Sequence, residues 1–549
     1  MAKKTAKELI AENEDLRKAV DGLVDVADAP QSLEEQVLAK LKEIEAILTK
    51  LDVESIDLSV FLEQIQSFSD EKKAELQALV DKLDNPLGEK TITMRTITRN
   101  QYTYAPLAYQ EVWKKDGKIT KYGNFFLKGF VDDYSLGITE GANHLVIPFP
   151  NDIEFDLLCI SPYSFFARPK AGQRDKSGIS GSLDNVLFVL GQGATGILGN
   201  GRTDTQRTPA YHTFPSRVKK IDVYCHGDNA NSGAFCLLEN GDLFVSGAQP
   251  NGIFGIGNKT QVNTWTKSKD NVSNFFIGST TAFCVSGNTI YGAGWNGIGQ
   301  IGIGDRETKT TWVQVKSGIA NPEKVLISTN YENHNSGNYA STLFLIDGLL
   351  YGAGYNGGNN IIAQSTSDQT SMIRVTDSIG NPLETPDGTQ FIMHPLETVI
   401  LIPNGENMDL YTGGNGIYGH GDSTSGSKKI SKVMTFEGKD WKIQSNFSPC
   451  SYGDQIECFM ICSETKQEAY AWGVNTGGKL GFGWIGDERT MHKVLLPKGK
   501  DFEIQLQICN GTDTGGIVCI VDGEMYACGD GSYGRVPLNC SIFSKIPTK

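Results

Sequence analysis

The sequence predicts a mainly β protein, with a C-terminal seven-bladed β-propeller over 181–549, a small β-rich connector over 89–180 and an N-terminal α-helical coiled-coil region over 1–88. Three observations support this prediction. Glycine accounts for 62 of the 549 residues, above the usual ~7%, which indicates many tight turns. A spacing of aromatic and glycine residues recurs along the last two-thirds of the chain. The first 88 residues contain almost no glycine and follow a heptad pattern instead.

Residues 1–88 are predicted to form a helical region for oligomerisation and attachment. Apolar residues recur at alternating spacings of four and three, as in a coiled-coil seam, and Asn13 fills one slot of that seam. The first seam comprises Leu9, Leu16, Val20, Leu23 and Ala27, and the second comprises Val37, Leu41, Ile44, Leu48 and Leu51. Such short coils become stable when chains associate, and a core asparagine favours a parallel oligomer. We expect a homotrimer; the alternative is a helical hairpin within one chain.

The connector over 89–180 contains strand signals of its own. Residues 91–98 alternate polar and apolar side chains as a half-buried strand does. Residues 145–150 read as an edge strand that is ended by prolines, because proline cannot donate to a sheet ladder. These patterns predict a small β-rich unit and assign it no function.

The propeller prediction rests on one divergent repeat. An aromatic residue is followed three positions later by glycine in seven units, and glycine returns five positions further on in all units except the fourth. The seven aromatics are Phe188, Phe244, Tyr291, Tyr351, Tyr411, Tyr470 and Tyr526. Before them lie short apolar runs split by Asn-Gly or Asp-Gly, a strong hairpin signal, as in 235–244 and 518–526. Units of about four short strands with repeating glycine and aromatic positions are typical of propeller blades.

Segment 291–305, Tyr-Gly-Ala-Gly-Trp-Asn-Gly-Ile-Gly-Gln-Ile-Gly-Ile-Gly-Asp, closely resembles the repeat of the regulator of chromosome condensation family, and 471–483 matches it equally well. The resemblance covers 185–549 and implies a propeller closed by seven repeats. The founder of that family binds chromatin and exchanges nucleotide on a small GTPase. The formal net charge of this chain is -14, which disfavours a nucleic-acid partner because phosphate binding needs clustered Lys and Arg.

The residues give no sign of catalysis, so we expect a protein that is not an enzyme and holds no cofactor or metal. The seven histidines form no zinc pattern, and the Gly-Asp pairs that begin at 241, 304, 421, 486 and 529 read as turns rather than calcium ligands. Four of the eleven cysteines, Cys236, Cys284, Cys462 and Cys519, recur at one repeat position, which predicts buried structural thiols. No signal peptide or membrane-spanning run stands out, so synthesis in a cytoplasm is expected.

The order of the regions suggests a function. An oligomerising coil followed by a terminal globular head is the layout of a phage tail fibre or receptor-binding protein, in which several linked weak sites gain avidity. We therefore expect a virion component that binds a glycan or protein receptor on the host surface and other tail proteins through its N-terminal region. The alternatives are an intracellular scaffold or inhibitor that grips one protein, and a structural tail or baseplate component.

The repeat leaves a few loop positions free to bind a ligand. We predict loop aromatics as the candidates, because exposed aromatics suit stacking on sugar rings or act as protein hot spots. These residues are Trp295, Tyr355, Trp484 and Tyr533. The alternative is that each aromatic packs over its neighbour's glycine loop. The fourth unit has lost the glycine ladder at 357–364, which marks either function or drift.

Overall fold

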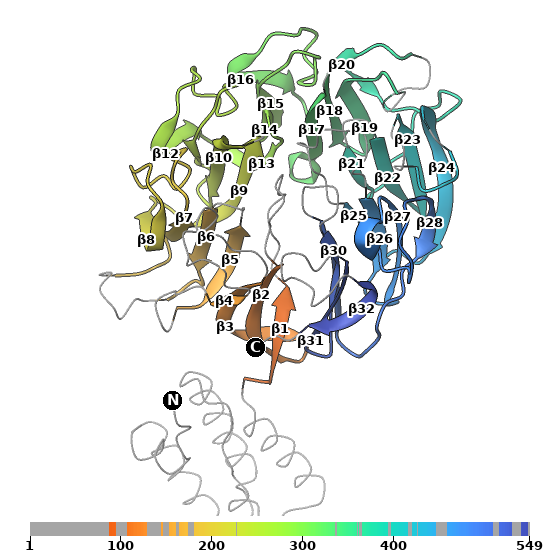
Figure 1. The fold of residues 1–549 in the computed structure, drawn as a ribbon. Coiled ribbons are helices and arrows are strands. Elements are labelled where there is room, and N and C mark those ends of the chain that lie inside the picture. The colour runs from red at the N-terminus through yellow and green to blue at the C-terminus, as the bar shows by residue number, and fades with distance from the viewer. Residues whose placement is uncertain are drawn as a thin grey trace, which may run out of the picture. The chain divides into compact units, whose positions relative to one another are not determined.

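The computed structural model describes a mainly β chain (Figure 1). The described residues are 87–94, 107–128, 144–146, 153–160, 164–173, 181–226, 228–334, 337–358, 361, 365–393, 397–415, 420–424, 426–445, 458–508, 515–529 and 540–546. The predicted coiled coil over 1–88 therefore lies almost wholly outside them. The chain divides into two compact units, one of 1–92 with 110–123 and one of 93–109 with 124–549.

The larger unit contains seven four-stranded sheets, here called blades 1 to 7 in chain order. Blade 1 comprises β5–β8 (Phe155–Ile160, Ser164–Pro169, Val186–Gly191, Gln206–Thr213), and blade 2 comprises β9–β12 (Val218–His226, Asp228–Leu238, Leu243–Gly247, Val262–Lys269). Blade 3 comprises β13–β16 (Val272–Ile277, Thr281–Ser286, Thr289–Gly294, Lys309–Lys316), and blade 4 comprises β17–β20 (Leu326–His334, Gly337–Ile346, Leu349–Gly354, Gln369–Arg374). Blade 5 comprises β21–β24 (Gln390–Met393, Glu397–Asn404, Asn407–Gly414, Lys428–Glu437). Blade 6 comprises β25–β28 (Lys442–Ser445, Cys458–Ser463, Glu468–Gly473, Glu488–Lys493), and blade 7 comprises β29–β32 (Phe502–Ile508, Gly515–Val521, Glu524–Gly529, Cys540–Ile546). Two short 3-10 helices, η1 (Pro322–Lys324) and η2 (Thr476–Gly478), lie in connections.

Each blade is an antiparallel meander, and the first strands of successive blades contact one another from β5 and β9 through to β25 and β29. The seven sheets follow one another in chain order around the inner strands (Figure 1). This confirms the predicted seven-bladed propeller, with one sequence repeat in each blade. The repeat aromatics all lie on third strands, as the hairpin signals predicted.

The propeller begins earlier than the repeat indicated. The first two strands of blade 1, β5 and β6, lie at Phe155–Ile160 and Ser164–Pro169, inside the range that the sequence assigned to the connector. Neither strand carries the aromatic–glycine spacing, because that spacing belongs to the third strand and the loop after it. A boundary drawn at the first repeat aromatic therefore misses the strands before it.

A further four-stranded sheet precedes blade 1 in the chain. It comprises β1 (Glu89–Met94), β2 (Leu107–Lys115), β3 (Lys118–Lys128) and β4 (His144–Val146), in that order, so the described part of the connector is β-rich. In the smaller unit the β2–β3 turn passes through Asp116 and Gly117, both with positive φ, as a tight type I′ hairpin requires. The ring of Trp113 lies 4.5 Å from Nζ of Lys121.

The hydrophobic core lies between neighbouring blades. One cluster joins Phe166 and Leu187 of blade 1 to Val223 and Trp265 of blade 2, and similar clusters join each later pair of blades. The predicted cysteines contribute to this packing from second strands, where all four are buried and free. Burial raises the pKa of Cys462 to about 12, so this thiol behaves as an apolar side chain.

The repeat glycines have two distinct structural causes. The glycine that ends each third strand has φ between 100° and 136°, a conformation that side-chain-bearing residues rarely adopt. Later glycines let the loop of one blade approach the fourth strand of the next: a Cβ at Gly199 would lie 2.4 Å from the indole of Trp265. Backbone hydrogen bonds of 2.8 Å join the same elements. The N–H groups of Gly201, Gly257, Gly304 and Gly483 donate to the carbonyls of Asn263, Thr310, Thr370 and Ser541, respectively. These glycines therefore join blades 1, 2, 3 and 6 to the blades that follow them.

Candidate functional site

In blades 3, 4 and 6, the loop that joins the third to the fourth strand contains a buried asparagine, which holds the loop in shape. In blade 3, Asn296 is fully buried; its Oδ1 accepts from the backbone N–H of Ile301 at 2.9 Å and its Nδ2 donates to the carbonyl of Asp305 at 2.9 Å. Asn356 and Asn475 make the equivalent pair of bonds in blades 4 and 6. These loops are thus rigid platforms on which other side chains are displayed.

Two of the four predicted aromatics, Trp295 and Tyr355, come together in one small cluster. Both are half-buried and pack with Ile298 and Ala340. Each ring also covers a glycine of its own loop: a Cβ on Gly297 would lie 2.3 Å from the ring of Trp295, and Gly357 has the same relation to Tyr355. Burial raises the pKa of the Tyr355 phenol. Their surroundings are those of packed side chains.

Trp484 has a different environment. It is 43% exposed and belongs to an aromatic group with Phe482 and His492, whose ring centroids lie 5.1 Å and 5.4 Å from that of Trp484. Its indole Nε1 donates to Oε1 of Glu488 at 2.9 Å, and Nε2 of His492 lies 3.2 Å from the other carboxylate oxygen. The carboxylate is therefore oriented from both sides, beside a tryptophan that remains open to solvent.

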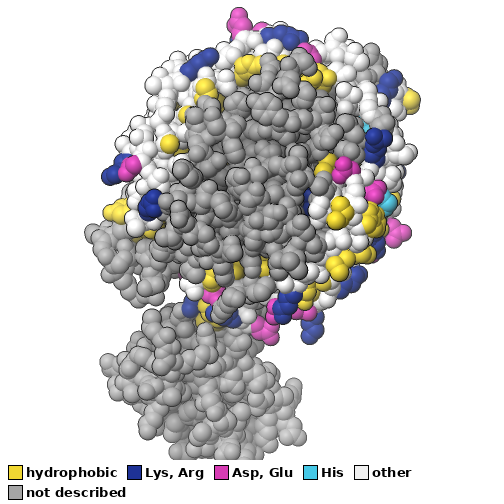
Figure 2. All heavy atoms as spheres, in the orientation of Figure 1, with side chains coloured by type: hydrophobic (Ala, Val, Ile, Leu, Met, Phe, Trp, Pro, Cys, Tyr) yellow, Lys and Arg dark blue, Asp and Glu magenta, His cyan; other side chains and the backbone are white. Residues whose placement is uncertain are grey.

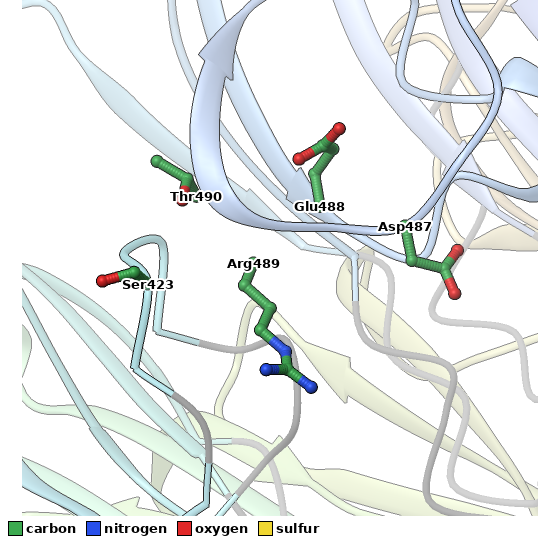
Figure 3. A pocket seen from close by; sticks show the side chains of 5 residues that line it. All are labelled: Ser423, Asp487, Glu488, Arg489 and Thr490. Carbon is green, nitrogen blue, oxygen red and sulfur yellow. The ribbon is translucent and has the colours of Figure 1, made fainter.

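Glu488 also lines a polar pocket between blades 5 and 6, with a volume of about 430 Å³. Ser423 belongs to the β23–β24 loop of blade 5, Asp487 directly precedes β28, and Glu488, Arg489 and Thr490 are the first residues of β28. Figure 3 shows Ser423 across from Thr490, while Arg489 leaves the strand on the side opposite to Glu488. Hydroxyl, carboxylate and guanidinium groups thus line one open pocket beside an exposed indole.

Exposed apolar side chains continue the surface beyond Trp484. Ile485 is 67% exposed, and Leu495 and Ile542 are more than half exposed. The last two flank Gly483, since a Cβ there would lie 3.3 Å and 3.9 Å from their methyl groups. We call Trp484, Ile485, Leu495 and Ile542 the apolar patch. Figure 2 shows hydrophobic side chains gathered beside acidic, basic and histidine side chains on the side where Figure 1 places β28 and β32.

The sequence singled out Trp484 but not the polar residues around it. Asp487 was visible as part of a Gly-Asp pair and was interpreted as a turn; its Oδ1 does accept from the backbone N–H of Asn475 at 2.9 Å. Glu488 and His492 are four residues apart, which brings two side chains to the same side of a strand. The spacing of Glu488 and His492 was the signal in the sequence that could have indicated these polar residues. Tyr533 lies outside the described residues.

Over the described residues, no group of three or more His, Cys, Asp or Glu side chains is placed to hold a metal ion. No helix in that part of the chain is long and apolar enough to cross a membrane.

No protein-family model matches the sequence. Among solved structures, the chain is similar to human WBSCR16, with 16% identity over 69% of this chain and 96% of that chain and a TM-score of 0.46. It is also similar to yeast RCC1 (Prp20), solved with Kap60, with 16% identity over 60% and 73% of the two chains and a TM-score of 0.40. For Hsv2 of Kluyveromyces lactis the identity is 9%, the coverage 70% and 94%, and the TM-score 0.30. Likenesses this distant carry no inference about function.

Proposed function

We propose that this chain is a non-enzymatic receptor-binding protein of the phage tail-fibre type, and that it binds a glycan of the host cell surface at the pocket between blades 5 and 6. One observation carries the proposal: the exposed Trp484 donates a hydrogen bond to Glu488, a residue that lines the pocket, and the Glu488 carboxylate is oriented by Trp484 and His492. The proposal is supported by the hydrogen bond between Trp484, which the sequence singled out, and the pocket residue Glu488.

The chemistry of the pocket suits a sugar. A pyranose ring presents an apolar C–H face, which packs on an aromatic ring, and a rim of hydroxyl groups that both donate and accept hydrogen bonds. The carboxylates of Asp487 and Glu488 accept, the guanidinium of Arg489 donates, and the hydroxyls of Ser423 and Thr490 do both. An oriented acceptor is more selective than a mobile one because less entropy is lost when the ligand binds.

The remaining parts of the chain fit this role. An oligomeric N-terminal region, expected to be a trimer that docks on other tail proteins, would present several propellers to one cell. Linked weak sites of this kind gain ~10²–10⁴ in avidity. We place the protein in the virion tail after synthesis in the host cytoplasm, with no nucleic-acid or membrane-inserted partner.

The test is binding of the labelled full-length chain to an array of bacterial surface polysaccharides and to intact cells of a panel of strains. Trp484→Ala should weaken binding at least ~tenfold, equivalent to about 1.4 kcal/mol. Tyr211→Ala is the matched control, because Tyr211 is also an exposed aromatic, at 51%, but lies on β8 of blade 1. Binding that is unchanged by Trp484→Ala, or equally weakened by the control, would contradict the proposal.

A second candidate is the intracellular scaffold or inhibitor, and the apolar patch favours it. Apolar side chains that are exposed side by side are typical of a protein-binding surface. In that case Leu495→Ser should abolish capture of a protein partner, and free saccharides should not compete. Under the glycan proposal Leu495→Ser leaves polysaccharide binding within ~twofold of the wild type.

A further inference from the structure

Blade 5 replaces a neutral pair of the repeat with an ionisable pair. In blade 3, Gln300 follows the second repeat glycine and donates to the hydroxyl of Thr281, the first residue of the second strand, at 3.3 Å. The corresponding residues of blade 5 are His420 and Glu397, and both are fully buried. Nδ1 of His420 lies 3.2 Å from Oε2 of Glu397.

The contacts of His420 favour an extra proton on this pair. Its Nε2 lies 2.9 Å from the carbonyl oxygen of Gly426, and a carbonyl only accepts, so Nε2 carries a hydrogen. Its Nδ1 faces a carboxyl oxygen, so either the imidazole is doubly protonated or the carboxyl of Glu397 is protonated. In both cases the pair holds one proton more than a neutral histidine beside a carboxylate.

The surrounding charges act on the same proton. Burial opposes the positive charge of His420, but the carboxylate of Glu397 and the carbonyl of Gly426 outweigh it, and the pKa of His420 is raised. The positive charge of Lys428, in β24, acts to lower the pKa of His420. Its ammonium is paired with Asp422 at 2.5 Å, which offsets part of its repulsion.

Residues 420–424 of the β23–β24 connection link this pair to the pocket. The carbonyl of His420 accepts from the hydroxyl of Thr412 at 2.8 Å. The next carbonyl, that of Gly421, accepts from the backbone N–H of Met491 at 3.0 Å. Ser423, two residues later, lines the pocket together with Asp487–Thr490. A change in the position of the loop at His420 would therefore move one wall of the pocket.

We propose that the buried His420–Glu397 pair is a pH-sensitive latch, which holds residues 420–424 against blade 6 while protonated and releases them when the proton is lost. Since the pKa of His420 is raised in the folded chain above 6.5, the latch contributes fully below about pH 6.5 and is lost as pH rises through the raised value. Release leaves a buried carboxylate facing an imidazole lone pair, which is unfavourable. The latch regulates glycan binding, so its functional consequence rests on the proposed function.

Amide hydrogen exchange of the full-length chain tests the latch without any ligand. Corrected for intrinsic rates, protection of the Met491 amide should fall ~tenfold or more between pH 6 and pH 9. Protection of the Gly257 amide, which bonds the carbonyl of Thr310 between blades 2 and 3, should stay constant as the control. A pH-independent Met491 amide would overturn the latch even if polysaccharide binding is found.

A variant separates the pair from other pH effects. His420→Gln with Glu397→Thr recreates the pair of blade 3 and should make protection of Met491 independent of pH. Polysaccharide binding by the wild type should weaken over the same pH range, and binding by the double variant should not. Constant wild-type binding together with a pH-dependent amide would contradict the regulatory role, whereas no binding at any pH would contradict the proposed function alone.

Discussion

The loops of blade 3 and blade 6 match the repeat equally well in sequence, yet they present different surfaces. Both are held by a buried asparagine, Asn296 in one and Asn475 in the other, with the same bonding pattern. In blade 3 the aromatic Trp295 is packed into a cluster; in blade 6 the aromatic Trp484 comes later in the loop and is exposed. The conformation of the loop and the exposure of its aromatic side chain therefore have different causes. The repeat determines the loop conformation, and the position of the aromatic within the loop determines whether its side chain is exposed.

The shared asparagine should produce the largest effect. Asn296→Ala leaves a buried N–H of Ile301 and a carbonyl of Asp305 without their partner, so we expect the free energy of unfolding to fall by about 2–4 kcal/mol. Asn475→Ala should cause a similar loss if the two loops share one scaffold. Chemical denaturation of the full-length variants measures both, and a loss below about 1 kcal/mol in either would break the comparison.

Trp295→Ala should have the next largest effect on the free energy of unfolding. The ring covers Gly297 and packs against the cluster of Ile298 and Ala340, so its removal should cost about 2–3 kcal/mol. Thermal unfolding gives the stability, and cell binding of the folded variant should match the wild type. An unchanged melt combined with lost binding would show that Trp295 is a ligand contact after all.

The two loops also differ at the position of Gln300, where blade 6 has Lys479. Gln300 donates to the carbonyl of Trp295, and its own oxygen accepts from the N–H of Ile298. Lys479 is fully buried, and among the described residues nothing accepts a hydrogen bond from its ammonium. Lys479→Gln should therefore stabilise the chain by about 1–2 kcal/mol, measured by denaturation, and Gln300→Lys should destabilise it. A destabilising Lys479→Gln would mean that the ammonium has a partner in solution.

Much of the fold could be read from the sequence because the repeat records backbone requirements. Gly294 and its equivalents occupy φ values that exclude side chains, and hairpin turns such as Asp522-Gly523 have the positive φ values that their sequence predicts. The start of the propeller at Phe155 could not be read, since β5 and β6 need only apolar residues. The pocket was missed for a related reason: Ser423 and Glu488 are more than 60 residues apart, and only the packing of blade 5 on blade 6 brings them together.

The smallest effect is expected for Trp484→Phe, which keeps an aromatic ring but removes the Nε1–H that orients Glu488. Because the residue is 43% exposed, stability should change by no more than about 0.5 kcal/mol. Polysaccharide binding should weaken ~threefold, because the carboxylate is then held by His492 alone, and combination with Glu488→Gln should add little. A stability loss above about 1 kcal/mol would place Trp484 with Trp295, as a packed side chain of the scaffold, and remove the distinction between the two loops.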